Sequence, residues 1–191
     1  MRYAITDRKL YPGDESAQRA ALVRQAAQLA SEGVELLQLR EKDLPLEELS
    51  SLAAEMLTAI RTAGGAIKLL VNGSVEAAVR AGADGVHLPA AMAMETVPHG
   101  LLVSVSCHSL DELERAITLG ADVALFGPVF GKRVAGEDIL PGIGLGRLRE
   151  ACSATSGRVS VVALGGVTEQ NATECIAARA AGVAGIRMFL R

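Results

Sequence analysis

The sequence has few aromatic side chains, no excess of basic residues and no long uncharged apolar segment. Aromatic residues make up 3% of the 191 residues, tryptophan is absent, and the formal net charge is −3. Nucleic-acid binding favours a basic surface with stacking aromatics, so this composition argues against it. The longest uncharged stretches, such as 101–110, have about half the ~20 residues of a membrane-spanning helix. We therefore expect neither a nucleic acid nor a membrane as a partner.

Cysteine is also scarce. Cys107, Cys152 and Cys175 are odd in number and form no CxxC pair, which favours free thiols in a reducing compartment. The first residues show no basic segment followed by an apolar one, so nothing marks export. Half of the residues are hydrophobic and the mean hydropathy is +0.30, which excludes a disordered chain. We expect a soluble, cytoplasmic α/β protein.

Short apolar runs alternate along the chain with longer, alanine-rich amphipathic stretches. The predicted strands are 2–6, 34–39, 67–71, 85–88, 101–106, 123–126, 160–164 and 184–188. The predicted helices are 16–31, 46–63, 75–81, 90–96, 110–119, 145–154 and 169–181. Because the strand segments are mostly apolar throughout, they are typical of parallel strands buried on both faces and joined by right-handed crossovers.

A weak repeat favours a barrel over an open sheet. Four glycines each follow a predicted helix and introduce a strand: Gly33, Gly82, Gly120 and Gly182. These strands are the second, fourth, sixth and eighth, and a repeat every second unit with eight strands fits a (β/α)8 barrel. The first strand leads into Thr6-Asp7-Arg8 rather than GxGxxG, which argues against a dinucleotide-binding sheet.

The predicted architecture is thus one TIM-barrel domain over residues 1–191 that lacks the last helix. The eighth strand ends just before Arg191, which leaves no room for an eighth helix. Either a partner chain covers that flank or the chain is truncated.

Polar residues follow the predicted strands, where barrels carry their sites. Gln38, Arg40 and Lys42 alternate along an extended segment, so their side chains share one face. Two cations leaving a barrel strand suit a phosphate or carboxylate ligand. The alternative is ordinary surface charge, with Glu41 as an ion-pair partner.

A glycine pair, Gly165-Gly166, follows the seventh strand. Glycines let the backbone approach an anion, and Thr168 is an expected N-cap of the next helix, whose N-terminus would complete a phosphate cup. A glycine pair is often only a turn, but its place after the seventh strand favours phosphate binding.

The three histidines carry less information. His99 is expected in a solvated loop and His87 as a buried structural residue. His108 follows the fifth strand and either belongs to the site or caps the helix that begins near Leu110. The sequence holds no zinc-like ligand spacing, no GxSxG elbow and no Walker loop.

Seven short motifs occur in order along the chain. They are Tyr3–Asp7, Gln38–Lys42, Val71–Gly73, Gly85–Leu88, Ser106–Ser109, Phe126–Phe130 and Ala163–Thr168. Together they resemble the thiamine-phosphate synthase/TenI superfamily over essentially the whole chain. The resemblance implies a (β/α)8 barrel of thiamine metabolism, commonly a homodimer.

The synthase branch joins a pyrimidine pyrophosphate to a thiazole phosphate with Mg²⁺ assistance. The resemblance implies that Gln38, Arg40, Lys42 and Asn72 face the pyrimidine pyrophosphate. It places Ser106 beside the substrates and the thiazole phosphate on Gly165 and Gly166. Lys132 would replace the usual lysine of the loop after the sixth strand.

The carboxylates that bind Mg²⁺ in the synthase pattern have no match here. The pattern has an aspartate directly after the asparagine, where this chain has Gly73. The second expected ligand falls in the stretch that reads Pro89-Ala90-Ala91-Met92. We therefore expect no cofactor, and Mg²⁺ only if synthase activity is retained.

Asn72-Gly73 and His87-Leu88-Pro89 look more like the TenI branch, whose thiazole tautomerisation needs no metal but requires an acid/base. Similar tautomerases carry a catalytic histidine where this chain has Pro128. We expect His108, with Lys42, to be catalytic, and His87 or Glu137 as the less favoured substitutes. Arg187, at the strand-eight phosphate contact, is expected either to supply phosphate charge or to end in solvent.

Three functions remain open. The first is a TenI-like, metal-independent thiazole tautomerase that binds a thiazole phosphate. The second is a divergent thiamine-phosphate synthase. The third is a non-catalytic ligand-binding or regulatory homologue.

Overall fold

Eight parallel strands form a closed barrel. The computed structural model describes residues 1–89, 97–134 and 137–190, without the side chains of 132–140. The barrel strands are β1 (Arg2–Ile5), β2 (Leu36–Leu39), β3 (Lys68–Asn72), β4 (Gly85–Leu88), β5 (Leu102–Cys107), β6 (Val123–Phe126), β9 (Ser160–Ala163) and β10 (Gly182–Gly185). Their order around the barrel is β1-β10-β9-β6-β5-β4-β3-β2. The prediction of an eight-stranded TIM-type barrel is confirmed.

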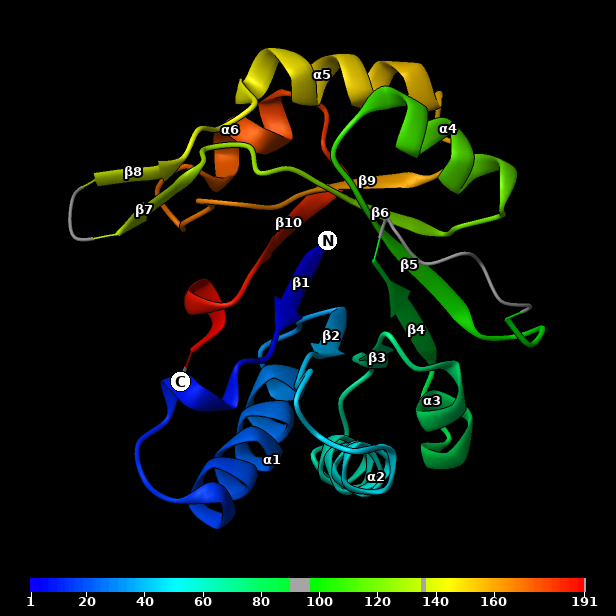
Figure 1. The fold of residues 1–191 in the computed structure, drawn as a ribbon, viewed down its shortest axis with the longest axis vertical. Coiled ribbons are helices and arrows are strands. Elements are labelled where there is room, and N and C mark those ends of the chain that lie inside the picture. Colours follow the sequence, from blue (N-terminus) through cyan, green and yellow to red (C-terminus); the bar gives the residue numbers. More distant parts are fainter. Residues whose placement is uncertain (90–96, 135–136, 191) are drawn as a thin grey trace.

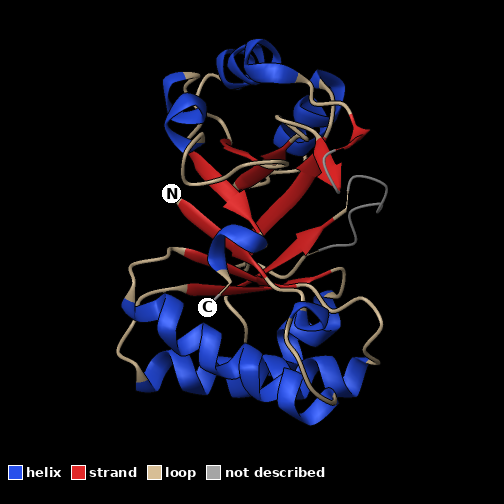
Figure 2. Ribbon diagram, turned by 90° about the vertical axis from the view of Figure 1, so that its left-hand side faces the viewer, coloured by secondary structure: helices blue, strands red, loops and turns tan. Residues whose placement is uncertain are grey.

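The α-helices lie in two groups on opposite sides of the barrel (Figures 1 and 2). One group contains α1 (Glu15–Ser31), α2 (Leu46–Thr62) and α3 (Val75–Ala81). The other contains α4 (Leu110–Thr118), α5 (Gly144–Thr155) and α6 (Ala172–Ala177). In the part of the chain that the structure describes, no helix is long and apolar enough to cross a membrane.

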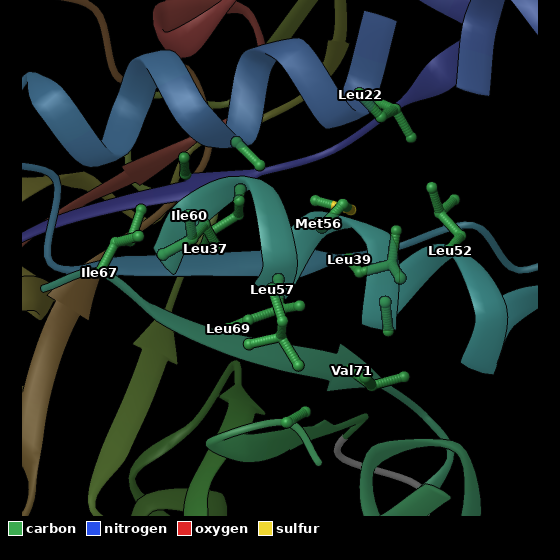
Figure 3. Close-up of a cluster of buried hydrophobic side chains, with 14 of the residues drawn as sticks. Leu22, Leu37, Leu39, Leu52, Met56, Leu57, Ile60, Ile67, Leu69 and Val71 are labelled. Atoms are coloured by element: carbon green, nitrogen blue, oxygen red, sulfur yellow. The ribbon is translucent and has the colours of Figure 1, made fainter. Parts of the chain in front are cut away.

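Buried apolar side chains fill both faces of the strands. Alternate strand residues point to opposite faces, so Leu36 packs inside the barrel while Leu37 and Leu39 pack against the helices. Figure 3 shows the outer cluster, in which Leu37 and Leu39 of β2 meet Met56 and Leu57 of α2. This two-sided burial is the physical reason why the strands are apolar throughout.

The glycine repeat is accompanied by a repeated hydrogen bond. Two residues after Gly33, Gly82 and Gly120 stand Glu35, Asp84 and Asp122. Their carboxylates accept hydrogen bonds from the backbone N–H groups of Arg2, Leu69 and Val103, at 2.6, 2.8 and 2.8 Å. Each acid therefore fixes the start of one strand against the strand beside it.

The fourth copy of the repeat does not follow this pattern. Gly182 lies inside β10 rather than at the end of a helix, and its predicted role as a helix cap is wrong. Ala184 stands where the other copies carry the acid. The residue with positive φ after α6 is Arg179, at 73°. Gly182 is instead required by close packing, since a Cβ there would collide with the backbone of Met1.

The last strand ends earlier than predicted, at Gly185, and Arg187 begins a short 3-10 helix, η2 (Arg187–Phe189). Phe189 is fully buried, and its carbonyl oxygen accepts a hydrogen bond from Gln25 Nε2 at 2.8 Å. The guanidinium of Arg2 lies 5.4 Å from the centre of the Phe189 ring. η2 therefore covers the flank beside β1 and α1, where no helix was expected.

Four further elements differ from the prediction. β7 (Lys132–Val134) and β8 (Glu137–Leu140) form an antiparallel hairpin between β6 and α5, in a stretch expected to be a loop. A 3-10 helix, η1 (Arg8–Leu10), follows β1. α6 is shorter than the predicted 169–181, and the predicted helix 90–96 lies outside the described residues.

Candidate active site

A chain of hydrogen bonds crosses the interior of the barrel towards the carboxyl ends of the strands. Gln38 Nε2 lies 3.3 Å from the Tyr3 hydroxyl, which lies 3.2 Å from Ser104 Oγ. Ser104 Oγ lies 2.9 Å from Nδ1 of His87, and His87 Nε2 lies 2.9 Å from Ser106 Oγ. Tyr3, Gln38, His87 and Ser104 are at most 3% exposed, whereas Ser106 is half-buried. We call these five residues the polar column.

His87 was expected to be a buried structural histidine, and it is buried. Its burial, together with the smaller effect of the charges of Arg40 and Lys42, lowers its pKa to about 3. The ring is therefore neutral near pH 7, and only one of its nitrogens carries a proton. Burial also raises the pKa of Tyr3, which stays a phenol. Because His87 contacts Ser106, it connects the barrel interior to a residue implicated in the site.

The cations Arg40 and Lys42 lie on the loop after β2. Arg40 is half-buried and Lys42 is exposed, and both act electrostatically on His87. Lys42 lines a cavity of about 270 Å³ together with Asn72, the last residue of β3, and Gly73, which follows it. The structure thus brings Lys42 and Asn72 together, as the sequence predicted.

Glu41, between the two cations, belongs to a separate buried network. Its carboxylate accepts hydrogen bonds from Thr6 Oγ1 at 2.7 Å and from the backbone N–H and Nη1 of Arg8, both at 3.1 Å. The backbone N–H of Arg40 donates to Thr6 Oγ1 at 2.9 Å. Among the described residues, neither Arg40 nor Lys42 forms an ion pair, so Glu41 is not the neutralising partner considered above.

The same network extends to Asp43. Arg8 donates to both oxygens of Asp43, from Nη1 at 2.6 Å and from Nη2 at 3.2 Å. Hydrogen bonds from Arg8 and then Lys9 hold the pKa of the Asp43 carboxyl below its usual range. The loop that carries Arg40 and Lys42 is therefore held to the segment after β1 by contacts at Arg40, Glu41 and Asp43.

A second cavity, of about 410 Å³, lies at the ends of β9 and β10. Gly165, Gly166 and Val167 line it together with Pro128 and Arg187. In the described part of the chain, the N–H groups of these first three residues donate to no other group. The φ angles of Gly165 and Gly166 are 94° and 67°. Successive N–H groups in such turns can form concave anion sites, so phosphate binding at the glycine pair stays a prediction.

The predicted N-cap at Thr168 is wrong, because α6 begins only at Ala172. Asn171, which the sequence analysis missed, holds this loop instead. Its Oδ1 accepts from the Thr168 N–H at 2.8 Å, and its Nδ2 donates to the Gly166 carbonyl at 3.0 Å. The predicted anion site is therefore lined by loop N–H groups rather than by a helix end.

His108 lies on the loop after β5, beside the residue that precedes Pro128. Its Nδ1 is 2.6 Å from the carbonyl oxygen of Gly127. A carbonyl only accepts, so Nδ1 carries a proton, and the neutral tautomer with that proton has its lone pair on Nε2. His108 does not cap α4; Ser109 does, since its Oγ accepts from the Glu112 N–H at 3.2 Å.

Some expected site residues are placed differently or lie outside the described side chains. Lys132 lies in β7 and Glu137 in β8, and the structure describes neither side chain. Arg187 is exposed on η2 rather than at a strand end, where it lines the second cavity.

Comparison with known proteins decides the family. The sequence matches the model of the thiamine monophosphate synthase (TMP-TENI) family over residues 2–189. The chain belongs to the thiamine monophosphate synthase family.

Two relatives carry synthase names. A putative thiamine-phosphate synthase of Geobacter sulfurreducens is 41% identical over 190 residues, which is 95% of this chain and 83% of that protein. A thiamine-phosphate synthase of Methanoculleus marisnigri is 38% identical over 187 residues, with 95% and 83% covered.

Solved structures of the same family share the fold. The thiamine phosphate pyrophosphorylase of Pyrococcus furiosus superposes with a TM-score of 0.78 and 28% identity, covering 97% of this chain and 84% of that one. The corresponding protein of Bacteroides thetaiotaomicron has a TM-score of 0.65 and 20% identity, covering 98% and 84%, and shows the fold alone.

The described residues do not fit the Mg²⁺ ion that synthases of this family use. Gly73 stands after Asn72, and the one carboxylate lining that cavity, Glu41, is occupied by Thr6 and Arg8. No group of three His, Cys, Asp or Glu residues in the described part of the chain could hold a metal ion. The stretch in which the second ligand was expected lies, from Ala90 onward, outside the described residues.

Proposed function

We propose that this protein is a thiamine-phosphate synthase, which joins a pyrimidine pyrophosphate to a thiazole phosphate and releases pyrophosphate. One observation carries the proposal: two separate regions suited to anions open at the same end of the barrel. One holds Lys42 and Asn72, and the other holds Gly165 and Gly166. A reaction between two phosphorylated substrates needs two such regions, whereas isomerisation of one phosphorylated substrate needs one. The synthase names of the relatives support the same reading.

In this reaction the pyrophosphate leaves with the electron pair of its bond to the pyrimidine, and the thiazole takes its place. Arg40 and Lys42, which have no ion-pair partner among the described residues, stabilise the negative charge that builds on the leaving pyrophosphate. The N–H groups of Gly165 and Gly166 hold the phosphate of the thiazole substrate. No step is assigned to a metal ion, since the described residues do not fit one.

Binding measurements with two variants test whether the two regions are separate. Arg40→Ala removes a charged hydrogen-bond donor worth about 1.5–3 kcal/mol, so pyrimidine pyrophosphate should bind roughly 10- to 150-fold more weakly. The affinity for thiazole phosphate should change little. Gly166→Ala should show the opposite pattern. If each variant weakens both ligands equally, or if neither ligand binds the wild-type protein, the proposal fails.

A second candidate is metal-independent isomerisation of a thiazole carboxylate phosphate. It is favoured by Gly73, which replaces a carboxylate, and by His108, whose Nε2 lone pair is available beside Pro128. A positioned histidine of this kind typically contributes 10²–10⁴-fold to a proton transfer. His108→Gln should then abolish tautomer turnover while thiazole phosphate binding persists. Unchanged turnover would exclude His108 as the acid/base.

Two other expectations from the sequence are tested separately. Binding of either ligand without turnover of any kind would leave the regulatory homologue as the function. A homodimer is expected from the family resemblance, and light scattering of the purified protein measures it.

A further inference from the structure

The polar column contains only groups whose hydrogen-bonding roles depend on each other. A hydroxyl group donates one proton, and a neutral histidine donates from one nitrogen and accepts at the other. Tyr3 and Ser104 are fully buried, so each proton in this part of the column must find a partner inside it. Fixing the role of one end therefore fixes the roles along the whole column.

The amide of Gln38 supplies that fixed end. Its Nε2 can only donate, and it donates to the hydroxyl oxygen of Tyr3. Tyr3 in turn donates its proton to Ser104 Oγ at 3.2 Å. Ser104 makes hydrogen bonds only with Tyr3 and His87 among the described residues, so its own proton goes to Nδ1 of His87. Any other arrangement leaves a buried hydroxyl proton unpaired, which is costly.

We propose that Gln38, acting through Tyr3 and Ser104, fixes His87 as the tautomer protonated at Nε2 and thereby makes Ser106 a hydrogen-bond donor to the substrate. His87 Nε2–H donates to Ser106 Oγ at 2.9 Å, so the hydroxyl proton of Ser106 is directed away from His87. Gln38, Tyr3, Ser104 and His87 are positioning residues in this scheme, because Ser106 is the only residue of the polar column that touches the substrate.

The scheme specifies the chemistry of the substrate atom that faces Ser106. That atom must be an acceptor without a proton, and Ser106 cannot serve there as a base. Its identification rests on the proposed function: Asn72, which lines the cavity of Lys42, is paired in register with His87, whose Nε2 contacts Ser106, so a pyrophosphate bound there lies on the side of Ser106. The acceptor is then an oxygen of the leaving pyrophosphate, whose growing charge the Ser106 proton stabilises.

The tautomer of His87 can be measured without any substrate. The chain has three histidines, so long-range ¹H–¹⁵N correlation spectra of the histidine-labelled protein are simple, and His99→Gln and His108→Gln assign the remaining signals. At pH 7 we expect His87 to show a protonated Nε2 and an unprotonated Nδ1. A proton on Nδ1, or on both nitrogens, overturns the proposal.

A matched pair of variants tests whether Gln38 sets the directions of the hydrogen bonds in the polar column. Gln38→Met keeps the side-chain length but removes the donor, so the signals of His87 should shift to those of a mixture of tautomers. Gln25→Met makes the same change in α1, where Gln25 donates to Phe189, and should leave the His87 signals unchanged. A single unchanged tautomer in Gln38→Met shows that Gln38 does not direct the column.

Turnover provides the functional readout. Tyr3→Phe retains the ring but removes the hydroxyl and with it the neutral hydrogen bonds to Gln38 and Ser104, so kcat for thiamine phosphate formation should fall about 3- to 10-fold with little change in KM. Equal kcat values in Tyr3→Phe and the wild type would remove the link between the column and catalysis. Because the spectra are recorded without ligand, a failed synthase assay leaves the tautomer result standing, and a failed tautomer result leaves the synthase proposal standing.

Discussion

The guanidinium of Arg8 and the carboxylate of Glu41 form a buried ion pair, with Nη1 and Oε2 3.1 Å apart. The side chains are 7% and 3% exposed. Their contact ties the segment after β1 to the loop after β2, directly between Arg40 and Lys42. The pair therefore holds two cations in place without neutralising them.

Glu41→Gln should destabilise the protein strongly, because it leaves the buried Arg8 with less compensation. Removing one partner of a buried ion pair lowers the free energy of unfolding by about 3–5 kcal/mol. Because Arg8 keeps its contact with Asp43, we expect the loss in Glu41→Gln to lie near the lower value. Urea unfolding measures the change. As a control, Glu150→Gln removes the exposed partner of Arg147 and should change stability by at most about 0.5 kcal/mol. Equal effects of the two substitutions would contradict the role given to Glu41.

Stability should fall as the pH is lowered from 6.5 to 5, owing to His87. An unfolded histidine takes up a proton below about pH 6.5, whereas His87 in the folded protein stays neutral down to about pH 3. The unfolded state thus binds more protons in this window, and each pH unit costs about 1.4 kcal/mol of unfolding free energy. Urea unfolding at several pH values measures the slope. His87→Gln should flatten it, and an unchanged slope in that variant would assign the effect to other groups.

Gly73→Asp should introduce a Mg²⁺ dependence. A Cβ at Gly73 has no atom within 4 Å, and although φ is +74°, aspartate tolerates this conformation better than most residues. With inorganic pyrophosphate present, Mg²⁺ should raise the melting temperature of the variant by about 2–4 °C for each kcal/mol of added binding.

Gly73→Asn is the matched control for that experiment, because it has the same shape and backbone strain without the charge. Its melting temperature should not respond to Mg²⁺ beyond the response of the wild type. Equal responses of the aspartate and asparagine variants would mean that position 73 does not face a metal site.

Gly166→Ala should weaken both the fold and phosphate binding. At φ +67° an alanine is strained by about 1–2 kcal/mol, and its Cβ would lie 2.7 Å from the Gly131 carbonyl oxygen. Gly146→Ala is the control in α5, where a Cβ has open space, and it should stabilise the protein by roughly 0.5–1 kcal/mol. Thermal unfolding and phosphate titration of both variants measure this contrast. A stable Gly166→Ala that binds phosphate normally would show that the glycine pair is only a turn.

The barrel could be predicted because its signal is local. The strands are apolar on both faces, and Gly33, Gly82 and Gly120 mark helix ends with positive φ. The eighth strand was predicted too late in the sequence, because Gly182 was interpreted as a helix cap like the other three glycines. A glycine is required there for a different reason, since the backbone of Met1 packs closely against it. A sequence pattern does not distinguish a helix cap from a close backbone contact.

The site was predicted only in part, because a sequence pattern shows local signals but not contacts between distant segments. Arg40, Lys42 and the glycine pair are recognisable because they directly follow strands. Tyr3 and Ser104, by contrast, are 101 positions apart in the sequence and meet only because the barrel closes. Asn171 was missed since its two bonds close a loop that looked like the start of a helix.

The central claim is that the two anion regions serve two substrates in one reaction. The most direct test is to incubate the purified protein with pyrimidine pyrophosphate and thiazole phosphate, with and without Mg²⁺, and to follow thiamine phosphate and pyrophosphate by chromatography. The account predicts equal amounts of both products, and much slower formation in Arg40→Ala. Absence of thiamine phosphate under conditions where both ligands bind would contradict it.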